Sequence, residues 1–338
     1  MKILYLHIAA GQASYRYRVE QYKPLWAASP HTVSYQTVVG IPTVQKLRHI
    51  LRCGEYDIVI LQKKLLHPLL IRAIKKRARL VFDFDDALYA RESYKKEKPR
   101  SVDPGSATAT KRLNFILRRA DMVLAGNREL AAYSKKFNSN VQLIPTPLPP
   151  AERVVLPRSG PPLRVGWIGN TYNLYYLRQI DDILFKIAAE QSGKFSFQLM
   201  SAAVPKGYFK TPWQLTPWSL ETEADWLSNI DIGLMPLNDD PWSRGKCAFK
   251  LLQYARHGKA LIASDVGANR EVVRHKVNGF LTGGDFSWEQ ALKAFVEDPE
   301  RAARFGQAAR EHFSRYFELT VIFKRLSEAL NRLTTVIR

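Results

Sequence analysis

Short apolar runs alternate with longer mixed stretches along the whole chain, and this alternation is the strongest constraint on its fold. The runs expected as strands in the first half are Ile3–His7, Val33–Thr37, Asp57–Leu61, Leu80–Asp85, Met122–Ala125 and Val141–Ile144. The stretches expected as helices lie near 16–28, 42–52, 67–77, 108–119 and 127–136. Strands that are apolar on both faces are typical of a parallel sheet covered by helices on both sides. The order of elements therefore predicts an α/β domain with a doubly wound sheet.

A proline-dense stretch between Pro145 and Pro162 interrupts the alternation and is typical of an interdomain linker. The later expected strands are Leu163–Ile168, Phe195–Met200, Ile230–Met235 and Ala260–Ser264, and the later expected helices are 173–190, 246–257, 268–274, 286–297 and 299–335, with a break near Tyr316. We therefore expect two Rossmann-like domains, residues 1–150 and 151–316, that face each other across a cleft, and a final helix at 317–338. Ligands of such sheets bind beyond the carboxyl ends of the strands.

The chain is strongly basic, and the excess of positive charge lies in its first half. The formal net charge of the 338 residues is +20. Residues 1–150 hold 26 Lys and Arg against 11 Asp and Glu, whereas residues 151–338 hold 25 against 20. Such a field attracts nucleic acid, anionic lipid headgroups or acidic substrates, and charge alone does not choose among them.

The sequence predicts a reduced protein without a membrane-spanning segment. Only Cys53 and Cys247 are cysteines, and they are far apart in the sequence. The first apolar run is broken by His7 and followed by two arginines, so we expect a buried strand rather than a signal peptide. No stretch reaches about 18 apolar residues. We expect a cytoplasmic protein, with the inner face of the membrane as a candidate location.

Residues 63–79 combine leucines with seven lysines and arginines. A basic amphipathic helix of this kind can rest on anionic lipid. The same pattern also fits a helix that covers the sheet and exposes its lysines to solvent. An anionic membrane surface is therefore one candidate partner.

The segment from Gly166 to Asn173 follows an expected strand and opens an expected helix. A glycine there lets the backbone approach a ligand closely, and the free N–H groups of a helix start favour anions. The same sequence pattern also fits a plain turn between a strand and a helix that binds no ligand. The chain has neither a Gly-x-Gly-x-x-Gly motif nor a phosphate-binding loop that ends in Gly-Lys-Ser/Thr, so the nicotinamide dinucleotide fingerprint is absent.

Three cations, Arg244, Lys246 and Lys250, lie in or just before the first turns of the helix expected at 246–257. A helix start prefers acidic residues, so these cations cost stability unless an anion lies among them. This conflict predicts a phosphate or diphosphate site, and the alternative is a basic, solvated helix end. The segment Gly267–Glu271 reaches the same sheet edge.

Two segments of the first half are candidates for a site on the facing domain. Asp83, Asp85 and Asp86 end a strand, and they would repel one another unless they bind sugar hydroxyls, balance basic neighbours or hold a metal ion. No cluster of histidines accompanies them, so we expect no metal. The loop Gly11–Arg18 follows the first strand, and its arginines are candidates for binding an acidic acceptor or for a solvated helix start.

Residues 245–273, GKCAFKLLQYARHGKALIASDVGANREVV, followed by Val277–Leu281, resemble the nucleotide-sugar domain of the family-four glycosyltransferases. The family pattern has a lysine three positions before an acidic residue and Tyr, then Gly-Lys and Asn-Gly-Phe. This chain has Lys250, Gln253-Tyr254, Gly258-Lys259 and Asn278-Gly279-Phe280 there, and the likeness covers roughly 160–318. LVFDFDD at residues 80–86, Ala125–Asn127 and Ile144-Pro145 resemble the acceptor domain of the same enzymes.

The resemblance implies the GT-B fold, with a UDP- or GDP-sugar between the domains as co-substrate and no cofactor or obligatory metal. It also implies hexosyl transfer with retention. From the basic first domain we expect a glycan or lipid-linked acceptor, as in polysaccharide biosynthesis. Two glutamates that hold the donor in this family fall on Gly245 and Gln253. The family's diphosphate-binding Arg and Lys are replaced by Asn170, Thr171 and Asn173, so Arg244 and Lys250 are the expected substitutes. The final helix resembles a segment that crosses back onto the first domain.

The expected site has three groups of residues. The catalytic group is Asp85, which aligns with an acceptor-domain histidine of the family, together with Arg244 and Lys250. The donor-binding group is Gly169, Asn170, Thr171, Asn173, Gly245, Phe249, Gln253 and Glu271, and the acceptor-binding group is Gly11, Ser14, Arg16, Arg18, Asp83 and Asp86. The missing glutamates keep open a non-catalytic scaffold or partner subunit. A nucleic-acid-binding protein is favoured by charge alone, and we expect no nucleic acid as partner.

Overall fold

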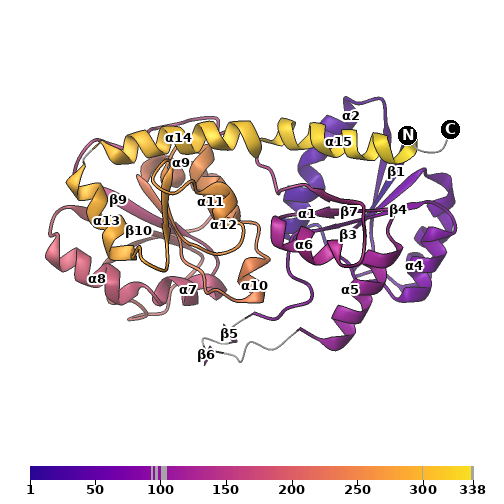
Figure 1. Ribbon diagram of the computed structural model, residues 1–338, viewed down its shortest axis with the longest axis horizontal. Helices are drawn as coiled ribbons and strands as arrows, with labels where there is room; N and C mark the ends of the chain where they lie inside the picture. The colour runs from indigo at the N-terminus through magenta and orange to yellow at the C-terminus, as the bar shows by residue number, and fades with distance from the viewer. Residues whose placement is uncertain (93, 96–97, 100–104, 299, 336–338) are drawn as a thin grey trace.

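In the part of the chain that the computed structural model describes, all residues but 93, 96–97, 100–104, 299 and 336–338, two parallel six-stranded sheets form the frame of the protein (Figure 1). The first sheet has the order β2-β1-β3-β4-β7-β8. Its strands are β1 (Lys2–His7), β2 (Thr32–Thr37), β3 (Ile58–Gln62), β4 (Arg79–Phe84), β7 (Met122–Ala125) and β8 (Val141–Leu143). The helices around it are α1 (Ala13–Arg18), η1 (Glu20–Tyr22), α2 (Lys23–Ala27), α3 (Thr43–Leu51), η2 (Arg52–Glu55), α4 (Pro68–Lys75), α5 (Ala107–Arg119) and α6 (Arg128–Lys135). A short hairpin of β5 (Tyr94–Lys95) and β6 (Lys98–Pro99) precedes α5.

The second sheet has the order β11-β10-β9-β12-β13-β14, and all its strand pairs are parallel. Its strands are β9 (Leu163–Ile168), β10 (Phe195–Ser201), β11 (Trp213–Pro217), β12 (Ile232–Met235), β13 (Ala260–Ser264) and β14 (Gly279–Thr282). The helices of this half are η3 (Thr171–Asn173), α7 (Leu174–Arg178), α8 (Asp181–Glu190), α9 (Leu220–Asn229), α10 (Pro241–Arg244), α11 (Phe249–Arg256), α12 (Asn269–Val272), α13 (Trp288–Glu297) and α14 (Arg301–Tyr316). The expected fold class, two doubly wound α/β domains, is confirmed.

Each face of the first sheet is covered by its own hydrophobic cluster. Leu4 and Leu6 of β1 pack into one cluster together with residues of α4 and α5, whereas Ile3 and Tyr5 pack into the other together with residues of α2. Successive side chains of a strand point to opposite faces, so a strand covered on both sides must be apolar throughout. This explains the uninterrupted apolar runs in the sequence.

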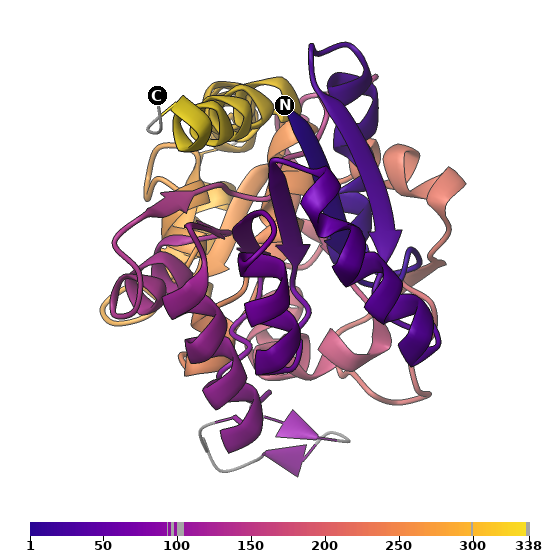
Figure 2. The ribbon, with the colours of Figure 1, turned by 90° about the vertical axis from the view of Figure 1, so that its right-hand side faces the viewer.

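The last helix, α15 (Leu319–Thr335), leaves the second domain and packs on the first (Figures 1 and 2). Ile322 and Leu326 belong to the same cluster as Ile3 and Tyr5. Near the other end of α15, the hydroxyl of Thr334 lies 3.4 Å from the sulfur of Met1. The final helix therefore buries an apolar face of the first domain.

The helix expected at 173–190 is divided into α7 and α8, and two further expected helices are interrupted or shortened near the domain interface. The helix expected at 16–28 is divided into α1, η1 and α2, because the backbone leaves the helical region at Val19, where φ is −130°. The helix expected at 246–257 begins only at Phe249, because Ala248 has the left-handed conformation, with φ of 51°. Both irregular positions lie near the carboxyl edges of the sheets, where the domains face each other.

Besides the four-residue helix α10, three elements of the second domain were not predicted. Polar residues interrupt β11, and Trp213, Gln214 and Thr216 give it no apolar run. The helix α9 buries only its last turn, at Trp226–Ser228. The third element, β14, is four residues long and forms the edge of the sheet. Edge strands and half-buried helices carry weak hydrophobic patterns, and these are the elements that were missed.

Candidate active site

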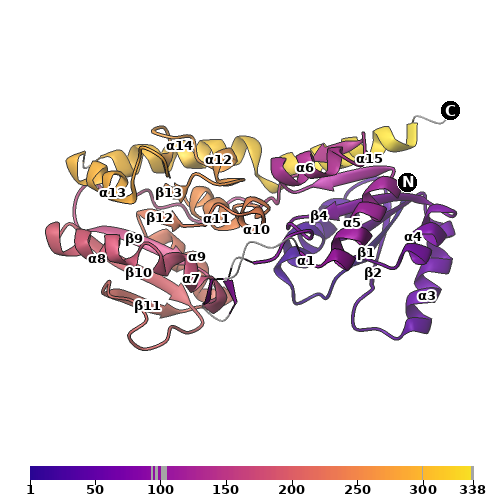
Figure 3. The ribbon, with the colours of Figure 1, turned by 60° about the horizontal axis from the view of Figure 1, so that its bottom comes forward.

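A cleft of about 480 Å³ lies between the carboxyl edges of the two sheets. Figure 3 shows α1 of the first domain facing α10 and α11 of the second. Eleven of the predicted site residues line the cleft: Gly11, Ser14, Arg16, Asp85, Asp86, Gly169, Asn170, Asn173, Phe249, Lys250 and Gln253. Six do not: Arg18, Asp83, Thr171, Arg244, Gly245 and Glu271.

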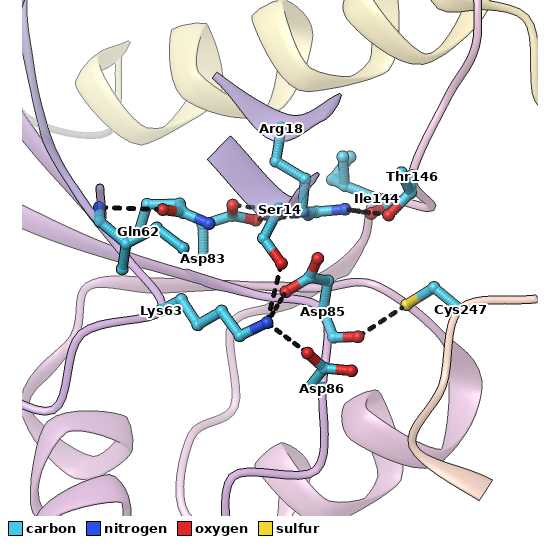
Figure 4. A network of polar contacts seen from close by, with 11 residues as sticks. Ser14, Arg18, Gln62, Lys63, Asp83, Asp85, Asp86, Ile144, Thr146 and Cys247 are labelled. Carbon is cyan, nitrogen blue, oxygen red and sulfur yellow. Dashed lines mark hydrogen bonds and ion pairs between the residues drawn. The ribbon is translucent and has the colours of Figure 1, made fainter. Parts of the chain in front are cut away.

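The wall formed by the first domain is organised around Lys63, which sequence reasoning did not place in the site (Figure 4). Its ammonium group lies 2.7 Å from the hydroxyl of Ser14 and 3.2 Å from Oδ1 of Asp85, and it also binds Asp86. Lys63 follows β3 with a left-handed backbone, at φ of 60°, and its N–H donates to the carbonyl of Asp83. The register between β3 and β4 therefore brings Lys63 to the acidic loop.

The Lys63 ammonium group and the two carboxylates set one another's charge states. Burial lowers the pKa of Lys63, but Asp85 and Asp86 outweigh it, so this pKa lies above its usual value. Burial opposes ionisation of Asp85, but Lys63 outweighs it and holds the pKa of Asp85 below its usual range. Burial and the neighbouring Asp85 together raise the pKa of Asp86. The wall thus offers one firmly ionised carboxylate beside a second that is easier to protonate.

Asp83 and Arg18 lie beneath this wall and not in the cleft. Both side chains are buried, and they form an ion pair in which Nε of Arg18 lies 3.0 Å from Oδ2 of Asp83 (Figure 4). The guanidinium group also donates to the carbonyl of Ile144 and to the hydroxyl of Thr146. Burial raises the pKa of Asp83, and Arg18 opposes this shift. The pair fastens α1 to β4 and to the segment that leaves the first domain.

The wall formed by the second domain presents two lysines. Lys246 and Lys250 line the cleft, and neither has a carboxylate within ion-pair distance among the residues that the structure describes. Burial lowers the pKa of both ammonium groups, and for Lys250 burial and the nearby Lys246 bring it to about 7. The ammonium group of Lys250 lies 5.4 Å from the ring centre of Trp167, and that of Lys246 lies 5.3 Å from that of Trp242. Two desolvated cations without a counter-ion form a site for an anion.

Arg244, the other predicted cation of this segment, points elsewhere. Its Nε lies 2.6 Å from Oδ1 of Asp239 in an exposed ion pair outside the cleft lining. Lys246 therefore stands beside Lys250 where the sequence pattern led us to expect Arg244.

Gly245 and Glu271 lie at the contact between the domains. A Cβ on Gly245 would lie 2.4 Å from the Cβ of Ala87 across that contact. The carboxylate of Glu271 accepts from the N–H of Arg128 at 3.0 Å. The side-chain amide of Asn127 also donates to the carbonyl of Lys246 at 2.9 Å. These contacts hold the lysine-bearing segment against the first domain.

The backbone turns sharply just before α11. Ala248 is a buried, non-glycine residue with φ of 51°, a conformation that costs of order 1 kcal/mol and concentrates at functional sites. The turn directs Phe249 toward the first domain, where its ring lies 4.3 Å from that of Tyr17. In the same segment, Sγ of Cys247 donates to the carbonyl of Asp85 at 3.1 Å. The segment at the start of α11 is therefore held against the first domain at two points.

One end of the cleft holds a polar cluster that sequence reasoning did not find. Glu223, in the first turn of α9, accepts at 2.8 Å from the side-chain amide of Gln253 and at 2.8 Å from the indole N–H of Trp218. All three side chains line the cleft. The only sequence signal was Gln253 itself, because neither β11 nor α9 was predicted.

Two further observations concern the described residues alone. They include no group of three or more His, Cys, Asp or Glu side chains arranged to hold a metal ion. In the same residues, every helix is too short or too polar to span a bilayer.

Part of the chain matches a known protein family, and nearly the whole chain is similar to solved structures. Residues 179–298 match the family model described as Glycosyl transferases group 1. No curated protein sequence matches the chain. A structure of HepE from Anabaena in complex with UDP and glucose superposes with a TM-score of 0.68 at 16% identity, covering 98% of this chain and 100% of that one.

Two other solved structures are similar over nearly their whole length. Sucrose-phosphate synthase from Thermosynechococcus elongatus superposes with a TM-score of 0.71 at 14% identity, over 99% of this chain and 100% of that one. The lipopolysaccharide outer core galactosyltransferase WaaB superposes with a TM-score of 0.64 at 13% identity, over 98% and 99%. At such identities the likeness concerns the fold, which is GT-B. The chain therefore has the GT-B fold, and the greater part of its second domain is similar to glycosyl transferases group 1.

Proposed function

We propose that this protein transfers a hexosyl group, with retention, from a nucleotide-diphosphate sugar to a glycan or lipid-linked acceptor. The observation that carries the proposal is the pair of desolvated ammonium groups of Lys246 and Lys250 in the interdomain cleft. The related HepE structures, one in complex with UDP and another with UDP-glucose, support a nucleotide sugar as donor.

The lysine pair would act on the leaving group. When the bond from the anomeric carbon to the diphosphate oxygen breaks, negative charge grows on the diphosphate. Ammonium groups already held in a site of low dielectric stabilise that charge without reorganisation. Lys250, whose pKa is about 7, would become fully protonated when the diphosphate binds beside it. We propose that these two charges replace a divalent cation, so that transfer continues in EDTA.

The first-domain wall would hold the acceptor. Asp85 is kept ionised by Lys63 and is placed to accept a hydrogen bond from a sugar hydroxyl. In our proposal the acceptor hydroxyl attacks from the face that the diphosphate leaves, and its proton passes to a phosphate oxygen. Arg16 lines the cleft and has no carboxylate partner among the described residues, which favours an acceptor that carries negative charge.

Thermal stabilisation by nucleoside diphosphates and their sugars tests this proposal. A ligand that binds the native state raises the melting temperature according to its saturation. We expect a rise for one base, and a loss of that rise in Lys246→Ala and Lys250→Ala. Lys194→Ala, an exposed lysine of the same domain, is the matched control. If no nucleotide at millimolar concentration stabilises the wild type, the non-catalytic scaffold is the better description.

We also propose that the protein works at an anionic membrane surface. The exposed face of α3 carries Val44, Leu47 and Leu51, which are 66%, 46% and 53% exposed, at the helical spacing i, i+3 and i+7. Arg48 on the same helix is exposed as well. The expected helix at 63–79 contributes less, because Ile71 and Ile74 of α4 are buried. An apolar stripe with basic neighbours favours binding in the headgroup region.

A further inference from the structure

We infer that Glu223 is the carboxylate that binds the ribose hydroxyls of the donor and that Trp218 supports its base. This inference rests on the proposed function, because it assumes that a nucleoside diphosphate occupies the cleft. Glu223 lies in α9 and Trp218 in the loop before it, so the donor-binding residues would extend beyond α11.

The first step of the argument is position along α11. Lys250 and Gln253 are three residues apart on α11, so they lie on the same face, about 4.5 Å apart along its axis. Both line the cleft. A diphosphate held by Lys246 and Lys250 at the helix start therefore leaves its nucleoside one turn further on, beside Gln253 and its partner Glu223.

The second step is hydrogen-bonding capacity. An ionised carboxylate has about four acceptor positions. In Glu223, Oε1 accepts from Gln253 and Oε2 accepts from Trp218, each at 2.8 Å, so each oxygen keeps a free lone pair. The two donors also fix the plane of the carboxylate before any ligand arrives. A vicinal diol offers two adjacent O–H donors, and these match the free lone pairs on the two oxygens of one carboxylate.

The third step is the surface next to the carboxylate. Trp218 is 41% exposed although it lines the cleft, and its backbone N–H donates to the carbonyl of Ser201 at 3.1 Å. That bond holds the backbone of Trp218, and the bond from the indole N–H to Glu223 holds its ring. A fixed, exposed aromatic face beside a diol-binding carboxylate is suited to a nucleobase, because every nucleobase has a π-face that can stack on an aromatic ring.

Pairs of nucleotides that differ only at the ribose test the role of Glu223. UDP, GDP and ADP are each compared with their 2′-deoxy and 3′-deoxy counterparts by calorimetry, and inorganic pyrophosphate reports on the lysine pair alone. We expect the wild type to prefer the ribonucleotide by at least about tenfold, as for hydrogen bonds to a charged group. Glu223→Gln should abolish that preference and leave pyrophosphate binding unchanged, whereas Glu221→Gln, an exposed residue of the same turn, should keep both.

The outcomes separate the two proposals. A ribose preference that survives in Glu223→Gln overturns the role of Glu223 and leaves the nucleotide-sugar proposal intact. If Trp218→Ala binds the nucleotide as tightly as the wild type, the stacking role fails. If neither pyrophosphate nor any nucleotide binds the wild type, the proposed function fails and the present inference fails with it.

Discussion

The affinity for a nucleotide sugar should depend on pH through Lys250. Burial and the nearby Lys246 lower the pKa of Lys250 to about 7, so the empty site carries a partly protonated amine at neutral pH. A bound diphosphate favours the charged form, so binding takes up a proton. With a pKa of about 7, the protonated fraction falls from about one half at pH 7 to about one tenth at pH 8. We expect affinity to fall about fivefold over that interval and about tenfold more by pH 9.

Calorimetric titration with a nucleotide sugar is the suitable assay, because its diphosphate has no group that titrates in this range. Titrations in two buffers of different ionisation enthalpy would count the protons taken up, about one half at pH 7 and close to one at pH 8. Lys250→Arg is the matched control, since a guanidinium group stays protonated throughout. Its affinity should not change with pH. Lys246→Ala should shift the fall in affinity to higher pH, because one of the two causes of the lowered pKa is removed.

The sign of the effect on stability follows from the same shift. The unfolded chain keeps Lys250 protonated up to its ordinary pKa near 10.5, so between about pH 7 and pH 10.5 the folded chain binds fewer protons. The free energy of unfolding should therefore gain from this residue as the pH rises through that window. An affinity that stays flat from pH 7 to pH 9, or a Lys250→Arg variant with the same pH dependence as the wild type, would refute the reasoning.

Three further outcomes are expected. Asp83→Asn leaves the guanidinium of Arg18 buried without its counter-charge, so the free energy of unfolding in urea should fall by about 3–5 kcal/mol, and a loss under about 1 kcal/mol would contradict the buried pairing. Gly245→Ala places a methyl group 2.4 Å from the Cβ of Ala87, so donor affinity should fall and the radius of gyration in solution scattering should rise; if neither changes, the close contact between the domains is wrong. Leu47→Asp should reduce sedimentation with anionic vesicles while Phe185→Asp, an equally exposed change in the second domain, should not, and equal binding by both would argue against the α3 surface.

The sequence was a good guide wherever burial on two faces imposes a pattern. Apolar runs such as Leu163–Ile168 and Ala260–Ser264 match β9 and β13 residue for residue, because central strands of a covered sheet have no solvent-facing side. The sequence pattern did not predict β11, because an edge strand has fewer neighbours and tolerates polar residues such as Gln214 and Thr216. Missing β11 and α9 also meant missing Glu223, whose place beside Gln253 exists only in three dimensions.

A second limit of prediction from the sequence concerns which cations lie in the site. Arg244 and Lys246 are two residues apart, and the sequence offers no reason to prefer one of them. The choice is made by Asp239, which holds Arg244 outside the cleft, and by the bond from Asn127 to the carbonyl of Lys246, which fixes the backbone. Lys63 was overlooked for a related reason. Its position depends on the register between β3 and β4, and a sequence pattern does not contain that register.

The chain crosses between the domains twice, and the two crossings are hydrogen-bonded to each other. The N–H of Leu148 donates to the carbonyl of Phe317 at 3.3 Å, and the N–H of Leu319 donates to the carbonyl of Leu148 at 2.9 Å. Two bonded strands at one place act as a hinge with a single axis, since they bend together but resist sliding. We therefore expect any opening that admits a substrate to be a rotation about Leu148, which would return the lysines of one domain to the same position against the acidic wall of the other.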